Sequence, residues 1–364
     1  MDERALTERL ITYNTSTLEG MQAAAGFVKG WLEARDVEVT GAQHNGRPLL
    51  TATVGPESGP TIVLHGHLDV VPGREEQFEP RIDGDRLYGR GAYDMKGGLA
   101  AMICAFRDVA AQDRVRVHFV CVSDEESEEV EDRGSDYLVR EGYLGDFAIT
   151  GEPTDMHIGI QAKGVLAMRI EVIGTAAHGS TPWVGDNAVL KAIDTFRQIE
   201  SLPFARESSD LFDRPSINLG RIVGGDAMNK VPDLCVIDVD VRYLPGQDPQ
   251  AIRDAVEALP DVHVAKVFHR QPAIVSRDDP YVQALGTAIA RVAEPTSERL
   301  GVGRDGASDA ISFLEAGMPA VECGPLGDGH HGPEEWVSIR SLGQYRAALV
   351  QFVDLLPARR LKIA

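Results

Sequence analysis

The stretch TIVLHGHLDVVP, residues 61–72, is the part of the chain from which the fold is most readily inferred. Its first seven residues form a short apolar run with the length of a buried β-strand. His65, His67 and Asp69 share the alternation of a strand and would face the same side. In an H-x-D sequence the histidine can bind a metal while the carboxylate contacts its far ring nitrogen and fixes the tautomer. We therefore expect His67 to be a metal ligand, Asp69 to orient it, and His65 to be structural.

Three more strand-like runs lead to polar segments. VRVHFVCVS (115–123) ends at Asp124, DFAIT (146–150) ends at the segment TGEPTD, and MPAVECG (318–324) runs toward DGHHGPEEW (328–336). Open α/β sheets bind ligands at the carboxyl ends of their strands. Helical spacing of apolar residues predicts helices over 3–12, 19–36 and 99–110. The order of these segments predicts an α/β sheet with a polar site at one edge.

Five segments supply the candidate ligands of that site, which are His67, Asp94, Glu126, Glu152 and His331. Two histidines and three carboxylates suit zinc, cobalt or manganese. The Asp94 carboxylate, in the glycine-rich GRGAYDMKGG (89–98), has the reach to bridge two metals of a hydrolase site. The alternative for Asp94 is an N-cap of the following helix, although a cap would normally sit nearer Gly98.

Several candidates compete within their segments. Glu125 and Glu126 are adjacent, so their side chains leave the backbone in different directions. One of them can bind metal while the other stands over the attacking water as general base. His330 and His331 likewise compete for one role.

The remaining candidates have ordinary alternatives. Glu152 could be a plain surface glutamate, and we interpret the acidic residues Glu128, Glu129, Glu131 and Asp132 as a solvated run. Ser308 and Asp309 have no histidine at the spacing of a known motif, so a serine triad has little support.

Composition narrows the class of protein. With 364 residues the chain exceeds what one core usually supports, so we expect two domains. The formal charge of −20 argues against nucleic-acid and anionic-membrane partners. The charged N-terminus, MDERALTERL, lacks an apolar signal core. Four cysteines without CxxC spacing favour buried, reduced thiols, and we expect a cytoplasmic protein.

The middle third of the chain has a different pattern. Its apolar periodicity predicts, in order, a strand (165–174), a helix (187–200), two strands (216–225 and 234–244), a helix (249–259) and a strand (262–269). This succession is βαββαβ, the split βαβ arrangement. We expect it as an inserted domain over residues 163–271, with a discontinuous first domain over 1–162 and 272–364.

Taken together, these segments resemble the M20 metallopeptidases, the group of acetylornithine deacetylase, succinyl-diaminopimelate desuccinylase, aminoacylase and carboxypeptidase G2. The resemblance covers nearly the whole chain and includes GTAAHGSTPWVGDNAV (174–189), NKVPD (229–233) and DVDVRYLP (238–245). It implies a zinc-exopeptidase-like α/β/α catalytic domain with an inserted ferredoxin-like lid and dimerisation domain.

The resemblance also implies roles for the candidate ligands. His67 and Glu152 would hold one zinc, Glu126 and His331 the other, and Asp94 would bridge them. Glu125 would then be the general base, and the peptide bond between Asp94 and Met95 would be cis. His331 is preferred over His330 because the family pattern places a glutamate four residues later, here Glu335.

For the inserted domain, the resemblance implies a homodimer in which His178 reaches the partner subunit's site. Asn229 and Arg242 match lid positions that hold the substrate carboxylate. The implied activity is removal of the acyl group from a small N-acyl amino acid, because Glu152 matches the glutamate of the deacylase branches. A dipeptidase or glutamate carboxypeptidase is the alternative, and a metal-dependent binding protein without turnover is a third hypothesis.

Overall fold

The computed structural model describes residues 1–127, 132–293, 301–306 and 309–357. The chain divides into two compact units, the first formed by Met1–Ile160, Val275–Val302 and Asp309–Ala364 and the second by Gln161–Ile274 and Gly303–Ser308. Glu128, Glu129 and Glu131 of the predicted acidic run, and Ser308, lie outside the described residues. Among the residues that are described, no helix combines the length and apolar character needed to cross a membrane.

The centre of the first unit is a parallel sheet made from the four strands that the apolar runs predict. These are β3 (Thr61–His67), β6 (Arg116–Val122), β7 (Phe147–Thr150) and β15 (Ala320–Glu322). They lie next to one another in the order β6-β3-β7-β15, and each neighbouring pair is parallel. Their carboxyl ends therefore meet at one edge, as predicted.

Antiparallel strands extend this sheet on either side. β1 (Val39–His44) and β2 (Arg47–Val54) continue it beyond β6, and β8 (Ile158–Ala162) pairs with β15 at Glu322 and Gly159. The short strands β13 (Ala273–Ile274) and β14 (Gly301–Arg304) both pair with β8 and belong to the same sheet.

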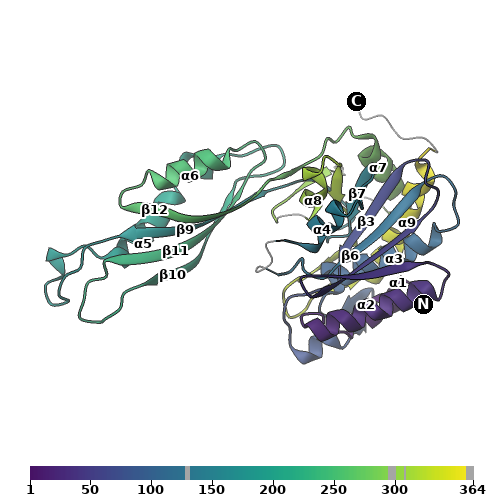
Figure 1. Cartoon of the computed structure of the whole chain (residues 1–364), viewed down its shortest axis with the longest axis horizontal. Helices are drawn as coiled ribbons and strands as arrows, with labels where there is room; N and C mark the ends of the chain where they lie inside the picture. The colour runs from purple at the N-terminus through teal and green to yellow at the C-terminus, as the bar shows by residue number, and fades with distance from the viewer. Residues whose placement is uncertain (128–131, 294–300, 307–308, 358–364) are drawn as a thin grey trace. The chain divides into compact units, whose positions relative to one another are not determined.

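Helices cover both faces of the sheet, which gives the predicted α/β/α layers (Figure 1). On one face, α4 and α8 pack over Val63, Val120 and Ala148 in one hydrophobic cluster. The other helices of the unit include α2, which contacts β1 and β2, and α3, which contacts β3 and β6. Their bounds are α1 (Glu3–Ile11), α2 (Leu18–Glu33), α3 (Gly97–Asp108), α4 (Gly134–Arg140), α7 (Pro280–Val292), α8 (Ala310–Glu315) and α9 (Ile339–Leu355).

Side-chain caps fix the starts of several helices. Asp2 caps α1, Thr17 caps α2 and Ser338 caps α9, each by accepting a backbone N–H of the first turn. Such caps satisfy amide groups that have no partner inside the helix. The predicted helix at 99–110 begins two residues earlier, at Gly97, without a side-chain cap.

A small antiparallel sheet brings two distant loops of the first unit together. Its strand order is β16 (Gly327–Asp328), β17 (Trp336–Ser338), β5 (Arg86–Tyr88) and β4 (Arg81–Asp83). Trp336 pairs with Tyr88, so the loop before β17 lies beside the segment after β5. The first carries His331 and the second leads to Asp94.

The second unit has the predicted βαββαβ succession. Its elements are β9 (Gly164–Ile173), α5 (Ala188–Ile199), β10 (Ser216–Gly224), β11 (Leu234–Tyr243), α6 (Pro249–Glu257) and β12 (Val262–Arg270). The strands are antiparallel in the order β10-β11-β9-β12. Residues of both helices join one hydrophobic cluster with β9 and β11, so only one face of this sheet is covered.

The chain enters and leaves the second unit at neighbouring positions. Ala162, at the end of β8, is the antiparallel partner of Ala273 in β13 (Ala273–Ile274). The entering and leaving segments are thus hydrogen-bonded to each other. All four cysteines, Cys104, Cys121, Cys235 and Cys323, are buried and unpaired, as predicted.

Candidate metal centre

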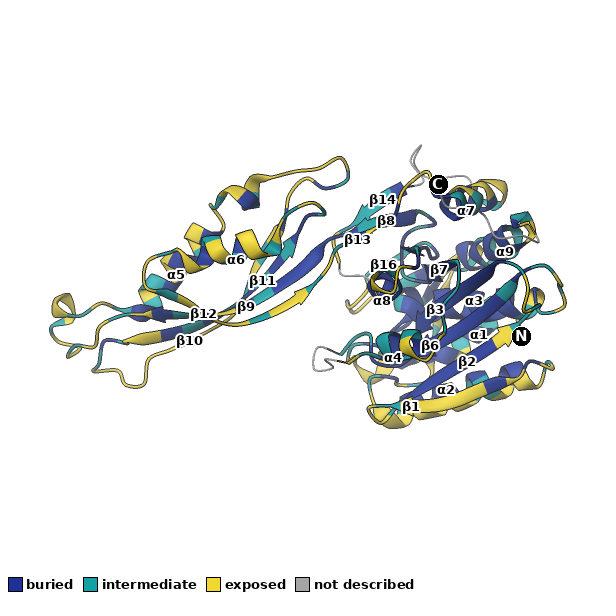
Figure 2. Ribbon diagram, turned by 45° about the horizontal axis from the view of Figure 1, so that its top comes forward, coloured by how far each residue is buried: buried dark blue, intermediate teal, exposed yellow. Residues whose placement is uncertain are grey.

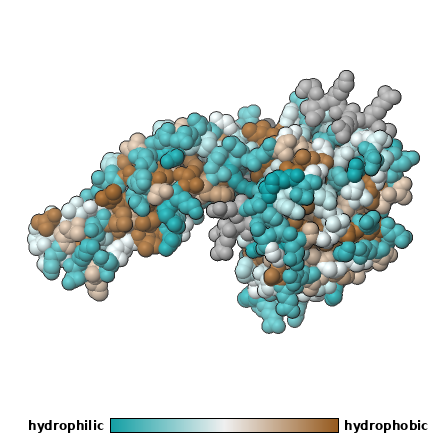
Figure 3. Space-filling view, in the orientation of Figure 1, coloured by the Kyte–Doolittle hydropathy of each residue, from teal (hydrophilic) through white to brown (hydrophobic). Residues whose placement is uncertain are grey.

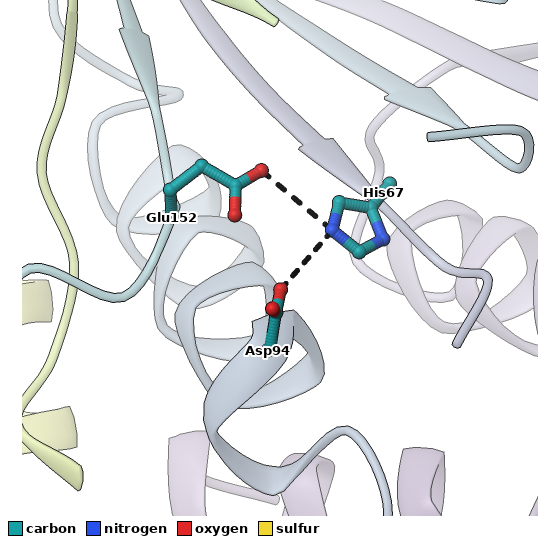
Figure 4. Close-up of side chains that lie close together, drawn as sticks. All are labelled: His67, Asp94 and Glu152. Atoms are coloured by element: carbon teal, nitrogen blue, oxygen red, sulfur yellow. Dashed lines mark ion pairs between the residues drawn. The ribbon is translucent and has the colours of Figure 1, made fainter. Parts of the chain in front are cut away.

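Three predicted ligands meet at the carboxyl end of β3. His67 ends that strand, Glu152 follows β7, and Asp94 lies in the irregular turn Ala92–Lys96 before α3. The Nε2 atom of His67 lies 3.4 Å from Oδ1 of Asp94 and 3.6 Å from Oε1 of Glu152 (Figure 4). One ligand atom from each residue lies within 4.8 Å of the others, close enough to hold one metal ion.

A second group shares Asp94. Nε2 of His331 lies 3.1 Å from Oε1 of Glu126 and 3.5 Å from Oδ2 of Asp94. The two oxygens of Asp94 therefore face different histidines, one in each group. This is the placement that a carboxylate bridging two cations requires.

Unsatisfied polar atoms show that the first group fits a cation. Nε2 of His67, Oδ1 of Asp94 and Oε1 of Glu152 are buried and have no hydrogen-bond partner. Buried polar groups in folded proteins are almost always bonded, because an unpaired one costs free energy. These three atoms point at a common position, and imidazole with carboxylates is a donor set for zinc, cobalt or manganese.

Burial and closely spaced carboxylates shift the pKa values of the side chains at the centre. Burial lowers the pKa of His67, but Glu152, Asp69 and Asp94 outweigh it and raise the pKa well above the usual range. Hydrogen bonds to Asp94 and Glu126 raise the pKa of His331 to about 10. Burial raises the pKa of Glu152 well above its ordinary value. A bound cation would supply the charge that these protons otherwise provide.

The contact between His67 and Asp69 differs in detail from the expected one. Nδ1 of His67 lies 3.0 Å from the backbone oxygen of Asp69 and 3.5 Å from its carboxylate oxygen Oδ1. The other carboxylate oxygen accepts the backbone N–H of Glu126 at 2.9 Å. Asp69 therefore contacts Nδ1 of His67 mainly through its backbone oxygen. Its carboxylate also accepts a hydrogen bond from the loop that carries Glu126.

The segment around Asp94 is shaped by close packing under glycines. Met95 lies beneath Gly66 and Gly151, where a Cβ atom would come within 2.7 Å and 2.6 Å of its methyl carbon. The strand end that carries His67 and the loop that carries Glu152 can both approach Met95 for this reason. The Asp94–Met95 peptide bond is cis, as the family resemblance implies. Asp94 does not cap α3, whose first turn has no side-chain cap.

The two adjacent glutamates diverge as expected. Glu126 joins the second group, whereas Glu125 points to Arg133, whose Nη1 lies 3.4 Å from its Oε1. Burial, and next the charge of Asp309, raise the pKa of Glu125 to about 8. A carboxyl group with a pKa near neutrality can both accept and return a proton.

The histidines without a predicted ligand role have other partners. His330 packs its ring edge-on against Tyr93, with 5.9 Å between the ring centres. His65 is fully buried, with Nε2 2.9 Å from Oγ of Ser135, and burial lowers its pKa to about 4. Neither ring belongs to a candidate ligand group among the described residues.

Sequence reasoning missed the residues that hold the Asp94 segment. Glu335 accepts the backbone N–H groups of Gly91, Tyr93 and Asp94 at 2.8–3.0 Å, and Nη1 of Arg90 at 3.0 Å. Arg90 also donates to the backbone oxygen of His331 at 3.3 Å. Because Glu335 is only 2% exposed, these bonds are shielded from water. The adjacent Glu334-Glu335 pair after the histidines was the available signal.

The predicted residues of the second unit lie at two ends of its sheet. His178 and Lys230 form an isolated antiparallel β-bridge through their backbones. The backbone N–H of Gly179 donates to the carbonyl oxygen of Asn229, so His178 and Asn229 are neighbours. Arg242 lies near the far end of β11, eight residues beyond Leu234, a distance of about 27 Å along a strand. Nε of Arg242 contacts Oδ2 of Asp240 at 2.9 Å.

Two carboxylate–histidine groups that share one aspartate, at the carboxyl edge of a parallel sheet, are the arrangement of a metal-dependent hydrolase. Residues 63–355 match the peptidase family M20/M25/M40. The chain belongs to this family, whose enzymes act on amide bonds with divalent metals.

The chain is also similar to individual proteins with known names. The chain is 30% identical to a succinyl-diaminopimelate desuccinylase of Leptothrix cholodnii, over 79% of this chain and 80% of the relative. It is 27% identical to an acetylornithine deacetylase of Proteus mirabilis, over 96% and 93%. Its fold matches the crystal structure of an M20 family metallo-carboxypeptidase from Sulfolobus solfataricus with a TM-score of 0.78 and 18% identity, over 98% and 99% of the two chains.

Proposed function

We propose that this protein is a two-metal amidohydrolase that removes the acyl group from a small N-acyl amino acid. The observation that carries the proposal is the pair of ligand groups joined by Asp94. Two relatives are named a desuccinylase and a deacetylase, and both names describe loss of an acyl group. Glu152, in the GEP segment, is the residue that the deacylase branches carry at this position.

The donor atoms support two ions, with zinc as the metal and cobalt or manganese as replacements. His67 and Glu152 would hold one ion and Glu126 and His331 the other, with Asp94 shared between them. Ions bound there would polarise the substrate carbonyl and lower the pKa of a water molecule.

Glu125 is the proton carrier in this proposal. It takes a proton from the water whose oxygen attacks the amide carbon. As the C–N bond breaks, Glu125 gives that proton to the leaving nitrogen, so the products are a carboxylic acid, which loses its remaining proton to solvent, and a free amine. His178 donates a hydrogen bond to the oxyanion.

The substrate carboxylate would bind to the lid residues Asn229 and Arg242. Arg242 offers a planar fork that suits a carboxylate. His178 and Asn229 lie near the Leu234 end of β11, and Arg242 is about 27 Å further along that strand, too far for one small substrate to touch all three in one copy. A homodimer, in which one copy supplies His178 and Asn229 and the other Arg242, meets the requirement.

Exposed hydrophobic side chains on the second unit support such a dimer. Leu190 and Ile193 of α5 and Ile222 and Val223 of the edge strand β10 are exposed, as is Trp183 at 78%. Figure 3 shows hydrophobic side chains gathered on the visible face of this unit. An uncovered edge strand beside apolar side chains is a common site of association.

Amine release from a panel of substrates tests the activity. N-acetyl- and N-succinyl-amino acids should be cleaved with higher kcat/KM than unblocked dipeptides, and exhaustive chelation should abolish turnover. Arg242→Ala should mainly raise KM. Faster cleavage of a dipeptide or a glutamate conjugate would move the assignment to a peptidase, and tight substrate binding without any turnover would favour a binding protein.

A complementation experiment tests the role of His178 in trans. Inactive His178→Ala chains mixed with inactive Glu125→Gln chains should regain partial activity, because one of the two mixed sites contains both intact residues. No recovery in verified heterodimers would contradict the dimer mechanism.

A further inference from the structure

Arg133 occupies a position between the proposed general base and a buried carboxylate. It is the residue before α4, and its guanidinium Nη1 lies 3.4 Å from Oε1 of Glu125 and 3.0 Å from Oδ1 of Asp309. The Asp309 side chain is 1% exposed, whereas the Arg133 and Glu125 side chains are 20% and 22% exposed. The guanidinium therefore links a fixed anion in the core to a carboxylate that retains access to solvent.

The anchor of this link is rigid. Oδ2 of Asp309 accepts a hydrogen bond from Oγ of Ser135 at 3.0 Å, and Ser135 in turn contacts the buried ring of His65. The backbone beside Arg133 is also held, because the N–H of Gly134 donates to Oδ2 of Asp124 at 2.7 Å. Both ends of the Arg133 side chain are thus tied to buried groups, and this fixes where its guanidinium can lie.

Glu125 has much less support of its own. Among the described residues, Arg133 is its hydrogen-bond donor, at a distance that is long for a full hydrogen bond. Two carboxylates, Glu125 and Asp309, face one guanidinium, and without it like charges in a partly buried site would repel each other. Removal of Arg133 would therefore push Glu125 away from Asp309 and change where its carboxylate points.

We propose that Arg133 is a positioning residue that holds the Glu125 carboxylate over the reacting water, with Asp309 as its anchor. This inference rests on the proposed function, because it requires Glu125 to be the general base. The looser contact to Glu125 leaves that carboxylate free to move a proton, while the tighter contact to Asp309 prevents Arg133 from following it. Misplacement of a reacting group by about 1 Å can cost ~10²-fold in rate.

A double-mutant cycle on the full-length metal-loaded protein tests the proposal. Arg133→Ala should lower kcat by ~10- to 100-fold while KM changes by less than about threefold. In the Glu125→Gln background the same change should alter kcat by less than about threefold, because the group that Arg133 positions is then absent. Arg133→Lys keeps the charge without the fork and should recover part of the loss.

Arg140→Ala is the matched control. Arg140 ends the same helix and pairs with exposed Asp132, so its loss should leave kcat unchanged. Thermal unfolding of every variant identifies losses that come from misfolding. If Arg133→Ala does not fold, the double-mutant cycle with Glu125→Gln is measured with Arg133→Lys and Arg133→Gln instead.

The outcomes separate the inference from the function on which it rests. Full activity of Glu125→Gln would overturn the proposed function. If Glu125→Gln is impaired but the Arg133 change lowers kcat equally in both backgrounds, or if it acts only on KM, the positioning role is wrong while the proposed function stands.

Discussion

The two sheets of this molecule differ in how they are covered. Strand β3 of the first unit is buried at every residue, because helices lie on both faces of its sheet. Strand β11 of the second unit alternates between buried and half-exposed residues, and the edge strand β10 is mostly exposed (Figure 2). The central strands of the first sheet are enclosed between helices, although its edge strand β1 is mostly exposed, whereas the second sheet keeps a whole face open.

This difference separates two kinds of functional position. In the first unit, the candidate ligands His67 and Glu152 lie at the ends of buried strands, and the closed core restricts how far these strand ends can shift. In the second unit, His178 and Asn229 are exposed and Arg242 is half-buried, and the proposed function would bring them to a substrate through a dimer. Under the proposed function, the first sheet would hold the reacting groups and the second would contribute contacts to the substrate.

The largest expected effect lies at the end of the enclosed sheet. Glu125→Gln keeps the shape of the side chain and removes its ability to accept a proton, so kcat should fall by ~10²–10⁴-fold. Elemental analysis should find the metal content unchanged. A drop in metal content would mean that the roles of Glu125 and Glu126 have been exchanged.

The buried pair behind the metal centre should have the next largest effect. Glu335→Ala leaves Arg90 unpaired in the core, since both side chains are at most 4% exposed, and should lower the free energy of unfolding by about 3–5 kcal/mol. Metal affinity should also fall by ~10–100-fold, because Glu335 orients the segment of Asp94. Denaturant titration and calorimetry measure the two effects.

Glu334→Ala is the control for that pair. Glu334 is adjacent in sequence but exposed, and it pairs with Arg81 at the surface. Its loss should leave the unfolding midpoint and the metal affinity unchanged. Equal effects of the two substitutions would show that the buried contacts of Glu335 do not hold the site.

Metal binding should depend on pH through the histidines of the centre. The pKa of His331 is about 10, so this ring carries a proton at pH 7 that a metal ion must displace. A rise in pH removes this competition, and the apparent affinity should increase by up to ~10-fold per pH unit for each displaced proton, until the pH approaches 10. Calorimetry in buffers of different ionisation enthalpy counts the protons, and release of none at pH 7 would contradict the expectation.

The smallest effect is expected on the open sheet. Arg169 and Asp238 face each other across β9 and β11 at 2.7 Å, but the arginine side chain is 46% exposed. Water screens such a pair, so Arg169→Ala should not change the unfolding midpoint measurably. A clear loss of stability would mean that this face is covered in solution, which would itself support an interface there.

Sequence patterns predicted the elements whose signal is local. The four parallel strands and the βαββαβ succession follow from short apolar runs and from periodicity, which each segment carries by itself. Glu152 and His67 were found because strand ends in such sheets point to one edge. The same reasoning did not predict β1, β2 or the long helix α9, because none of these elements carries one of the polar motifs.

Contacts between residues far apart in the sequence could not be predicted from such local patterns. Nothing in the order of residues shows that Glu335 bonds to the backbone of Gly91, Tyr93 and Asp94, because those bonds depend on how β5 and β17 pair. The choice between His330 and His331 is similar. The residues of the segment do not decide it by themselves. The family resemblance predicted His331, and in the structure His331, in the left-handed conformation with φ of 61°, turns toward Asp94 and Glu126.

The pairing of Ala162 with Ala273 has a consequence for how such a chain could arise. More than a hundred residues intervene between two positions that are already hydrogen-bonded neighbours, so a tight hairpin could replace them without moving either strand. An ancestor without the second unit needs no other change of connectivity. The second unit is therefore inserted at a position where its removal would leave the order of the strands in the first sheet unchanged.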